Sequence, residues 1–179
     1  MLLTQTALSG ATLIDLDVKS DSRGFFARTF CRDEFARAGL DPIVEQCGLA
    51  YNHLAGTVRG MHYQLPPAAE AKLVRCTRGA ILDIIVDVRP DSATYCQHLA
   101  VELTADNRRA LYVPPMFAHG YQTLVDATEV SYQVSERYTP GMERGLRFDD
   151  PALALTWPAP VTVVSDKDRA WPPMQTAAR

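Results

Sequence analysis

The sequence predicts an all-β domain, a sandwich or a barrel, from three observations. Apolar runs are short, turn-forming residues interrupt them at close intervals, and one segment alone has a helical pattern over more than a turn. Twelve prolines, several of them paired, lie between the apolar runs and act there as turn formers. The 179 residues contain no internal repeat, low-complexity segment or linker, so we expect residues 1–179 to form a single domain.

The first expected strand covers residues 11–18, where apolar and polar side chains partly alternate. Residues 32–38 carry the helical pattern. Asp33 can cap the start of that helix, and Gly39 can end it because glycine readily adopts the left-handed backbone of a C-terminal cap. We therefore expect a short helix here among the strands.

Residues 80–88 carry the strongest strand signal of the chain. Apolar side chains dominate this segment, and only Asp83 and Asp87 interrupt them. So dense an apolar run predicts a strand that is covered on both faces. The remaining expected strands are residues 56–64, 72–77, 98–103, 110–113, 120–124, 129–134 and 161–164.

Composition excludes several classes of protein. Hydrophobic residues make up 47% and charged residues 22% of the chain, both near globular averages, which excludes a disordered or fibrous protein. The net charge of −3, from 18 basic and 21 acidic residues, offers no basic surface to nucleic acid. No apolar stretch approaches the roughly 20 residues of a membrane-spanning helix. We expect neither a nucleic-acid nor a membrane partner.

Targeting and cofactor motifs are missing as well. Residues 1–7 lack a basic region followed by an apolar run, so we expect no secretory signal. The four cysteines are widely spaced without a Cys-x-x-Cys pair, which favours reduced thiols in the cytoplasm, although their even number leaves pairing open. Neither GxGxxG nor GxxxxGK[ST] occurs, so a nicotinamide- or ATP-binding α/β domain is not expected.

Two histidines lie in surroundings that suggest a site. His62 is inside the strand-like segment 59–64, and His119 follows the apolar segment 114–118 where we expect a turn. Either histidine alone is most simply a hydrogen-bonded core residue. Their neighbours argue for more, because basic and phenolic side chains fall on nearby strand segments. These neighbours are Arg59, Lys72, Arg75 and Tyr132.

The metal-binding pattern of cupin barrels is incomplete in this chain. That pattern is Gly-x5-His-x-His-x3,4-Glu-x6-Gly followed by Pro-x-Gly-x2-His, and here Gln64 replaces the second histidine and Met116 replaces a glycine. His62, Glu70 and His119 remain possible ligands of a divalent ion. Because the basic neighbours would repel a cation, we expect no metal.

Without a metal, the same residues suit another chemistry. A histidine base, a tyrosine acid and a lysine cation fit the removal of a proton next to a carbonyl group. The base takes the acidic hydrogen, the cation stabilises the enolate oxygen, and the phenol returns a proton to the opposite face. Such a reaction needs no cofactor, in agreement with the missing phosphate-binding loops.

Motifs along nearly the whole chain then identify a family. They are DSRGFF at 21–26, RGMHYQ at 59–64, KLV at 72–74, residues 79–89, AHGY at 118–121, DDP at 149–151, WP at 157–158 and SDKD at 165–168. In this order they resemble the dTDP-4-dehydrorhamnose 3,5-epimerase family, a cupin-like group that acts on nucleotide-linked 4-keto sugars. The resemblance implies a cupin-like double-stranded β-helix, or jelly roll barrel, with one or two short helices.

The resemblance also implies roles for individual residues. His62 matches the catalytic base, Asp168 the carboxylate paired with it, and Tyr132 the proton donor. Lys72 and His119 match residues near the sugar carbonyl and the phosphates. A carboxylate beside the base makes physical sense, because it fixes the imidazole tautomer and stabilises the imidazolium.

Further matches concern the nucleotide half of the substrate. Arg23 and Arg59 match diphosphate contacts, and guanidinium groups bind phosphate oxygens in a bidentate manner. Tyr138 matches an aromatic residue that stacks on the base, and Glu143 and Lys167 align with other binding positions, although both are equally well explained as solvated surface charges. A homodimer is implied, in which the N-terminal strands carry their arginines into the partner's site.

The chain departs from the family pattern at two places near the nucleotide. Gln46-Cys47-Gly48 stands where the family usually has Gln-Asp-Asn, and Arg28 stands where it usually has glutamate. Arg28, Gln46 and Gly48 are therefore candidate substrate contacts of altered chemistry. A site built to hydrogen-bond one base rejects another mainly through unpaired buried groups. We hypothesise a preference other than dTDP-4-keto-6-deoxyglucose; the alternative is that neighbouring residues compensate.

Together these observations predict a cofactor-independent epimerase of nucleotide-diphospho-4-keto-6-deoxy sugars, which supplies deoxysugar and polysaccharide synthesis. Inversion proceeds through an enolate at C3, C5 or both, since the number of centres depends on the shape of the cavity. Two alternatives use the same scaffold. One is a 3,4-ketoisomerase of sugar nucleotides, and the other is a cupin that binds a sugar nucleotide without catalysis.

Overall fold

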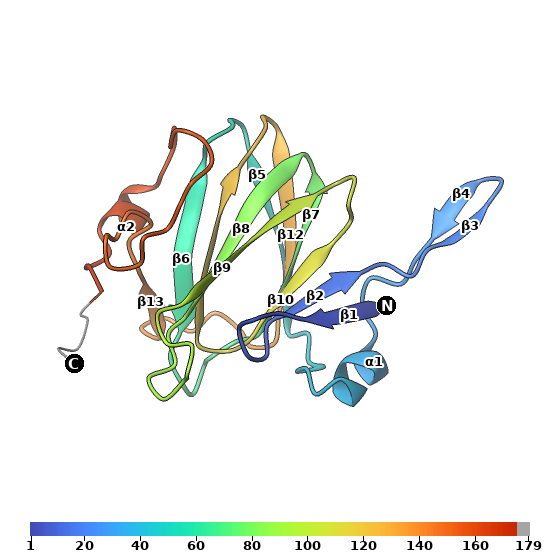
Figure 1. The fold of residues 1–179 in the computed structure, drawn as a ribbon, viewed down its shortest axis with the longest axis horizontal. Coiled ribbons are helices and arrows are strands. Elements are labelled where there is room, and N and C mark those ends of the chain that lie inside the picture. Colours follow the sequence, from blue (N-terminus) through green and yellow to red (C-terminus); the bar gives the residue numbers. More distant parts are fainter. Residues whose placement is uncertain (175–179) are drawn as a thin grey trace.

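The computed structural model describes residues 1–174, which form two antiparallel sheets facing each other and a projecting hairpin (Figure 1). The six-stranded sheet has the order β1 (Leu2–Gln5), β2 (Thr12–Asp15), β10 (Ala110–Val113), β7 (Lys72–Arg78), β12 (Thr128–Val134), β5 (Gln46–Asn52). The five-stranded sheet has the order β13 (Glu143–Gly145), β6 (Val58–Gln64), β11 (Phe117–Thr123), β8 (Ala80–Asp87), β9 (His98–Thr104). The hairpin consists of β3 (Lys19–Asp21) and β4 (Gly24–Phe26). The predicted all-β fold is confirmed.

The main core lies between the two sheets. Val74 and Leu111 of the six-stranded sheet and Ile81 and Phe117 of the five-stranded sheet belong to one buried cluster. Such a core forms because successive side chains of a strand point to opposite faces, so each sheet presents one apolar face to the other.

Strand β8 is covered on both faces, as its sequence predicts. Ile81 and Ile85 pack in the core between the sheets, whereas Ile84 and Val86 pack in a second cluster on the outer face. That outer cluster includes Leu153, from the chain segment that follows β13. The continuous apolar run is therefore explained by two separate partners, one on each side of the strand.

Several expected elements have different bounds. Residues 161–164 form no strand and contribute one isolated bridge, between Val163 and Thr57. The turn expected at His119 is also wrong, because β11 begins at Phe117 and places His119 inside the strand. The left-handed backbone that reverses the chain lies earlier, at Met116, whose φ is 60°.

The first helix, α1 (Arg32–Arg37), ends as predicted but begins differently. Cys31 occupies the N-cap and Asp33 lies in the first turn without a capping bond, so the expected Asp33 cap is wrong. Gly39, with φ of 73°, does end the helix, and its N–H donates to the carbonyl of Ala36. The next N–H, that of Leu40, donates to Phe35, which completes a Schellman motif.

The second helix, α2 (Asp166–Arg169), is a single turn that packs near β6. Its N-cap is Ser165, whose hydroxyl oxygen accepts a hydrogen bond from the backbone N–H of Asp168. Within the described residues, neither helix is long and apolar enough to cross a membrane.

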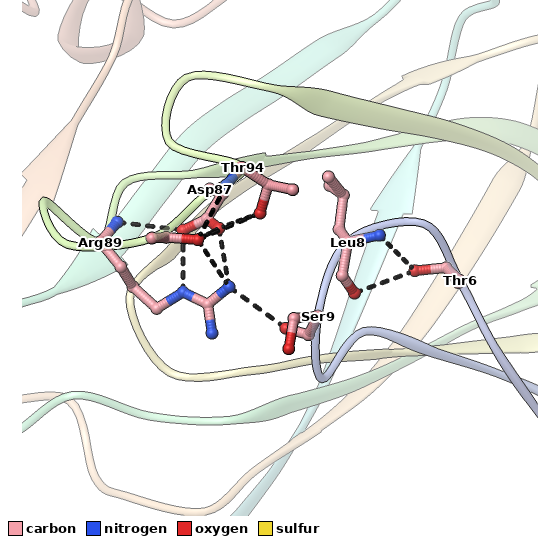
Figure 2. A network of polar contacts seen from close by, with 7 residues as sticks. Thr6, Leu8, Ser9, Asp87, Arg89 and Thr94 are labelled. Atoms are coloured by element: carbon pink, nitrogen blue, oxygen red, sulfur yellow. Dashed lines mark hydrogen bonds and ion pairs between the residues drawn. The ribbon is translucent and has the colours of Figure 1, made fainter.

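A buried carboxylate joins the end of β8 to the turn between β1 and β2 (Figure 2). Asp87 accepts hydrogen bonds from the guanidinium of Arg89 at 2.7 and 2.8 Å, and from the hydroxyls of Ser92 and Thr94 at 2.5 and 2.6 Å. Arg89 in turn donates to the carbonyl of Ser9 at 3.2 Å. Burial raises the pKa of the Asp87 carboxyl, but these bonds outweigh it and lower the pKa to about 2.

We expect Asp87→Asn to destabilise the fold at pH 7 by about 2 kcal/mol, from a carboxyl pKa of about 2 in the folded chain and 3.8 unfolded. Because the folded pKa is the lower one, the stabilisation is complete well above pH 4 and is lost as the pH falls toward 2. Urea unfolding at pH 7, 5 and 3 measures this, with exposed Asp91→Asn as the control. An equal gap between wild type and Asp87→Asn at all three pH values would contradict the assignment.

Candidate active site

A cavity of about 580 Å³ opens between the two sheets. Its walls come from β6 and β11 on one side and from β5, β7 and β12 on the other, and α2 lies at its rim. Most of the residues singled out in the sequence line it: Gln46, Arg59, His62, Lys72, His119, Tyr132, Tyr138, Glu143, Lys167 and Asp168. The fold thus gathers side chains that are far apart in the sequence.

His62 and Asp168 form a hydrogen-bonded pair in this cavity. Nε2 of His62 lies 2.6 Å from Oδ1 of Asp168, which is only 4% exposed. The other oxygen, Oδ2, accepts a hydrogen bond from the Gly60 N–H at 3.3 Å. The N-cap bond from Asp168 to Ser165 holds α2 so that the carboxylate faces β6. Asp168 is therefore held at its backbone N–H by Ser165 and at its carboxylate by Gly60.

This carboxylate stays ionised at neutral pH. Burial raises the pKa of Asp168, but the hydrogen bond and charge of His62 and the Gly60 N–H together lower it below the usual value. An ionised carboxylate can only accept, so Nε2 of His62 carries a hydrogen, and in the neutral imidazole the lone pair therefore lies on Nδ1. The pair is thus arranged so that Nδ1 can act as a base.

Tyr132 faces the same cavity from the opposite sheet. It lies on β12, between Gly48 of β5 and Val74 of β7, and the residue is 37% exposed. His62 belongs to β6 of the five-stranded sheet. A flat substrate held between the sheets would therefore meet an imidazole on one side and a phenol on the other.

Lys72 connects the two walls. Its ammonium donates to the backbone carbonyl of His62 at 3.0 Å and pairs with Glu70 at 3.2 Å. Glu70 is buried, and its Oε2 has no hydrogen-bond partner among the described residues. Glu70, a possible metal ligand from the sequence, pairs here with Lys72. Within residues 1–174, no group of three potential metal-ligating side chains occurs.

A second histidine–carboxylate pair lies deeper in the cavity wall. Nε2 of His119 is 2.8 Å from Oδ1 of Asp83, a fully buried residue of β8. Sequence reasoning did not include Asp83 in the site. A signal was present, since Asp83 interrupts the densest apolar run of the chain, where an aspartate needs a polar partner.

The rim of the cavity carries a connected polar cluster. The side-chain oxygen of Gln46 accepts from the backbone N–H of Tyr138 at 3.3 Å, and Lys167 donates to Glu143 at 2.5 Å. Hydrogen bonding to Glu143 raises the pKa of the Lys167 ammonium, which therefore stays charged. Deeper in the cavity, Arg59 donates to the side-chain oxygen of Asn52 at 2.8 Å. The cavity thus combines the aromatic ring of Tyr138 with the cations Lys167 and Arg59, a combination suited to binding a nucleotide.

The family model of dTDP-4-dehydrorhamnose 3,5-epimerase matches residues 5–176. This chain belongs to the dTDP-4-dehydrorhamnose 3,5-epimerase family. The family member of Sinorhizobium fredii is 44% identical over 153 residues, which are 85% of this chain and 78% of that protein.

Solved structures of related epimerases have the same fold as this family member. The dTDP-4-dehydrorhamnose 3,5-epimerase of Bacillus anthracis, with TDP and PPi bound, superposes with a TM-score of 0.93 at 39% identity over 97% of this chain and 99% of that one. A 3'-monoepimerase of Streptomyces bikiniensis in complex with dTDP-quinovose gives 0.87 at 32% identity over 94% and 85%. Both support the cupin-like architecture predicted from the motifs.

Three predicted substrate contacts of this family member lie outside its own cavity. Arg23 is on the β3–β4 hairpin, where its side chain is 89% exposed and its guanidinium pairs with Asp21. Arg28 pairs with Glu34 of α1 at 3.2 Å. Gly48 lies on β5 beneath the ring of Tyr132. The two arginines therefore make no contact with the cavity of the same chain, and their role in a partner's site stays a prediction.

Proposed function

We propose that this chain is a cofactor-independent epimerase of nucleotide-diphospho-4-keto-6-deoxy sugars, with His62 as base and Tyr132 as proton donor. The observation that carries the proposal is that a carboxylate-held imidazole and a phenol face one cavity from opposite sheets. Inversion of a carbon requires removal of a proton from one face and delivery to the other. Two acid–base groups on opposite walls meet that requirement.

The reaction begins with proton transfer to Nδ1 of His62. The C–H bond next to the keto group breaks, and its electrons move onto the keto oxygen as an enolate. Asp168 stabilises the imidazolium, while Lys72 and His119 are the nearby groups suited to stabilise the enolate oxygen. Tyr132 then gives its phenolic proton to the opposite face of the carbon. Solvent returns a proton to the phenolate and removes one from the imidazolium.

The rim cluster is proposed to bind the nucleotide diphosphate. Tyr138 would stack on the base, and Arg59 and Lys167 would bind phosphate oxygens. The related enzyme of Bacillus anthracis holds TDP and PPi, which supports a nucleotide ligand of this kind. The chain's Cys47, Gly48 and Arg28 replace polar or acidic groups of the family pattern, so we propose a nucleotide or sugar preference that differs from dTDP-4-keto-6-deoxyglucose.

A panel of 4-keto-6-deoxy sugar nucleotides in deuterated water tests this function. An epimerase incorporates deuterium at C3, C5 or both and yields an inverted product. A 3,4-ketoisomerase would give a new keto position in the carbon spectrum, and a binding module would give neither change. Equal turnover of dTDP-4-keto-6-deoxyglucose and every other sugar nucleotide would contradict the shifted preference.

We also propose a homodimer that shares its active sites, located in the cytoplasm. The β3–β4 hairpin projects from the body of the chain (Figure 1), and Phe26 at its base is 70% exposed. The outer face of the six-stranded sheet exposes Leu49 and holds two buried guanidinium nitrogens of Arg75 without a partner among the described residues. A second copy would cover these groups. The four unpaired cysteines favour a reducing compartment.

Mixing two inactive variants tests the shared site. We expect Arg23→Ala and His62→Ala each to lose activity, and their mixture to regain about a quarter of the wild-type rate. Half of the randomly formed dimers then contain one site with both native residues. Light scattering of each variant and of the mixture measures whether dimers are present. A mixture as inactive as its components, under conditions where the subunits exchange, would contradict sharing.

A further inference from the structure

The ring of Tyr132 occupies the space that a side chain at position 48 would fill. Gly48 and Tyr132 are direct partners on neighbouring strands β5 and β12. A Cβ atom built on Gly48 would lie 2.3 Å from Cζ and 2.5 Å from Oη of Tyr132. The optimal separation of two non-bonded carbon atoms is about 3.5–4.0 Å, so this contact would be a severe clash. The phenol can rest over β5 only because residue 48 has no side chain.

Glycine is required here for space and not for backbone conformation. Gly48 is absent from the glycines with positive φ, so its backbone is one that other residues also adopt. Directly opposed residues of antiparallel strands have Cβ atoms about 5 Å apart and project to the same face. The ring of Tyr132 therefore leans across its own strand pair onto the bare backbone of β5.

We propose that Gly48 is a positioning residue, which holds the phenol of Tyr132 against β5 and thereby sets its aim as proton donor. The inference rests on the proposed epimerase function. Any side chain at position 48 would collide with this placement of the ring. Gly48 thus acts through Tyr132 and not by touching the substrate.

The base is separate from this arrangement. His62 and Asp168 belong to the opposite wall, and neither is among the atoms nearest to Gly48. A side chain at position 48 should therefore displace the proton donor and leave proton removal in place. The two half-reactions can be measured separately, since solvent exchange reports removal and net inversion reports delivery from the opposite face.

Gly48→Ala tests the proposal with the substrate that wild type turns over best. We expect the ratio of net inversion to deuterium exchange to fall roughly 10- to 100-fold, as for a catalytic group misplaced by about 1 Å. Exchange itself should change only a few-fold. Tyr51→Phe is the matched control, because this exposed tyrosine of β5 does not line the cavity and should keep the wild-type ratio.

The fold should tolerate this substitution. The atoms that must move are the partly exposed end of the Tyr132 side chain, and alanine suits an edge strand at least as well as glycine. Thermal unfolding within a few degrees of wild type confirms that the chain is intact.

A double variant separates positioning from a general effect. In the Tyr132→Phe background the donor is already gone, so adding Gly48→Ala should lower the ratio no further. The proposal is overturned by an unchanged or higher ratio in Gly48→Ala, or by an equal fall in both backgrounds. The absence of exchange in wild type with every sugar nucleotide would instead refute the proposed function itself.

Discussion

Replacing His62 by alanine should abolish deuterium exchange at the carbons next to the keto group. A single general base contributes about 10²- to 10⁴-fold, and the other histidine of this wall, His119, is paired with Asp83 and assigned to the enolate oxygen. Because abstraction precedes delivery, net inversion should fall by the same factor as exchange. Exchange followed by proton NMR in deuterated water measures the effect.

The variant leaves Asp168 buried without its histidine, so a second substitution is needed. His62→Asn keeps an amide that can donate to the carboxylate but has no basic nitrogen, and it should be as inactive as His62→Ala. His98→Ala, at an exposed histidine that begins β9, is the matched control and should retain full activity. Retained exchange in a folded His62→Ala would refute the base assignment.

Removing only the hydroxyl of Tyr132 should separate the two halves of the reaction. In Tyr132→Phe we expect exchange to persist, while net inversion falls about 10²- to 10⁴-fold because the acid on the opposite wall is lost. Product stereochemistry measured beside deuterium content gives both rates from one sample. Tyr51→Phe, an exposed tyrosine of β5 outside the cavity, controls for the loss of a phenol. A parallel fall of both rates would show that Tyr132 is needed before protonation.

The strands were largely predictable because their signals are local. The alternation of apolar and polar side chains, together with the turn-forming residues at the ends of each run, predicts strands at residues 110–113 and 129–134. Their bounds agree with β10 and β12 to within one residue. Strand β5 escaped notice, since its residues 46–52 are mostly exposed and pair with β12 alone. Residues 161–164 are apolar enough to predict a strand. They form only one isolated bridge, between Val163 and Thr57, because no neighbouring strand pairs with them along their length.

The candidate site was predictable in its members and not in its arrangement. The residues came from motifs, which carried His62 and Asp168 although 106 positions separate them. Asp83 was overlooked because its partner, His119, is 36 positions away and was expected at a turn. Arg23 and Arg28 matched the motifs equally well, yet neither reaches the cavity of its own chain.

The sequence by itself determined the all-β class, which follows from local patterns of side chains, and its motifs predicted the kind of acid–base chemistry. Only the tertiary structure decided which side chains face each other. His62 opposes Tyr132 because β6 and β12 belong to different sheets, and the ring of Tyr132 rests on Gly48 because β5 and β12 pair in one particular register. Register and sheet packing arise from contacts between distant segments, in which a shift of one residue would turn every side chain to the other face.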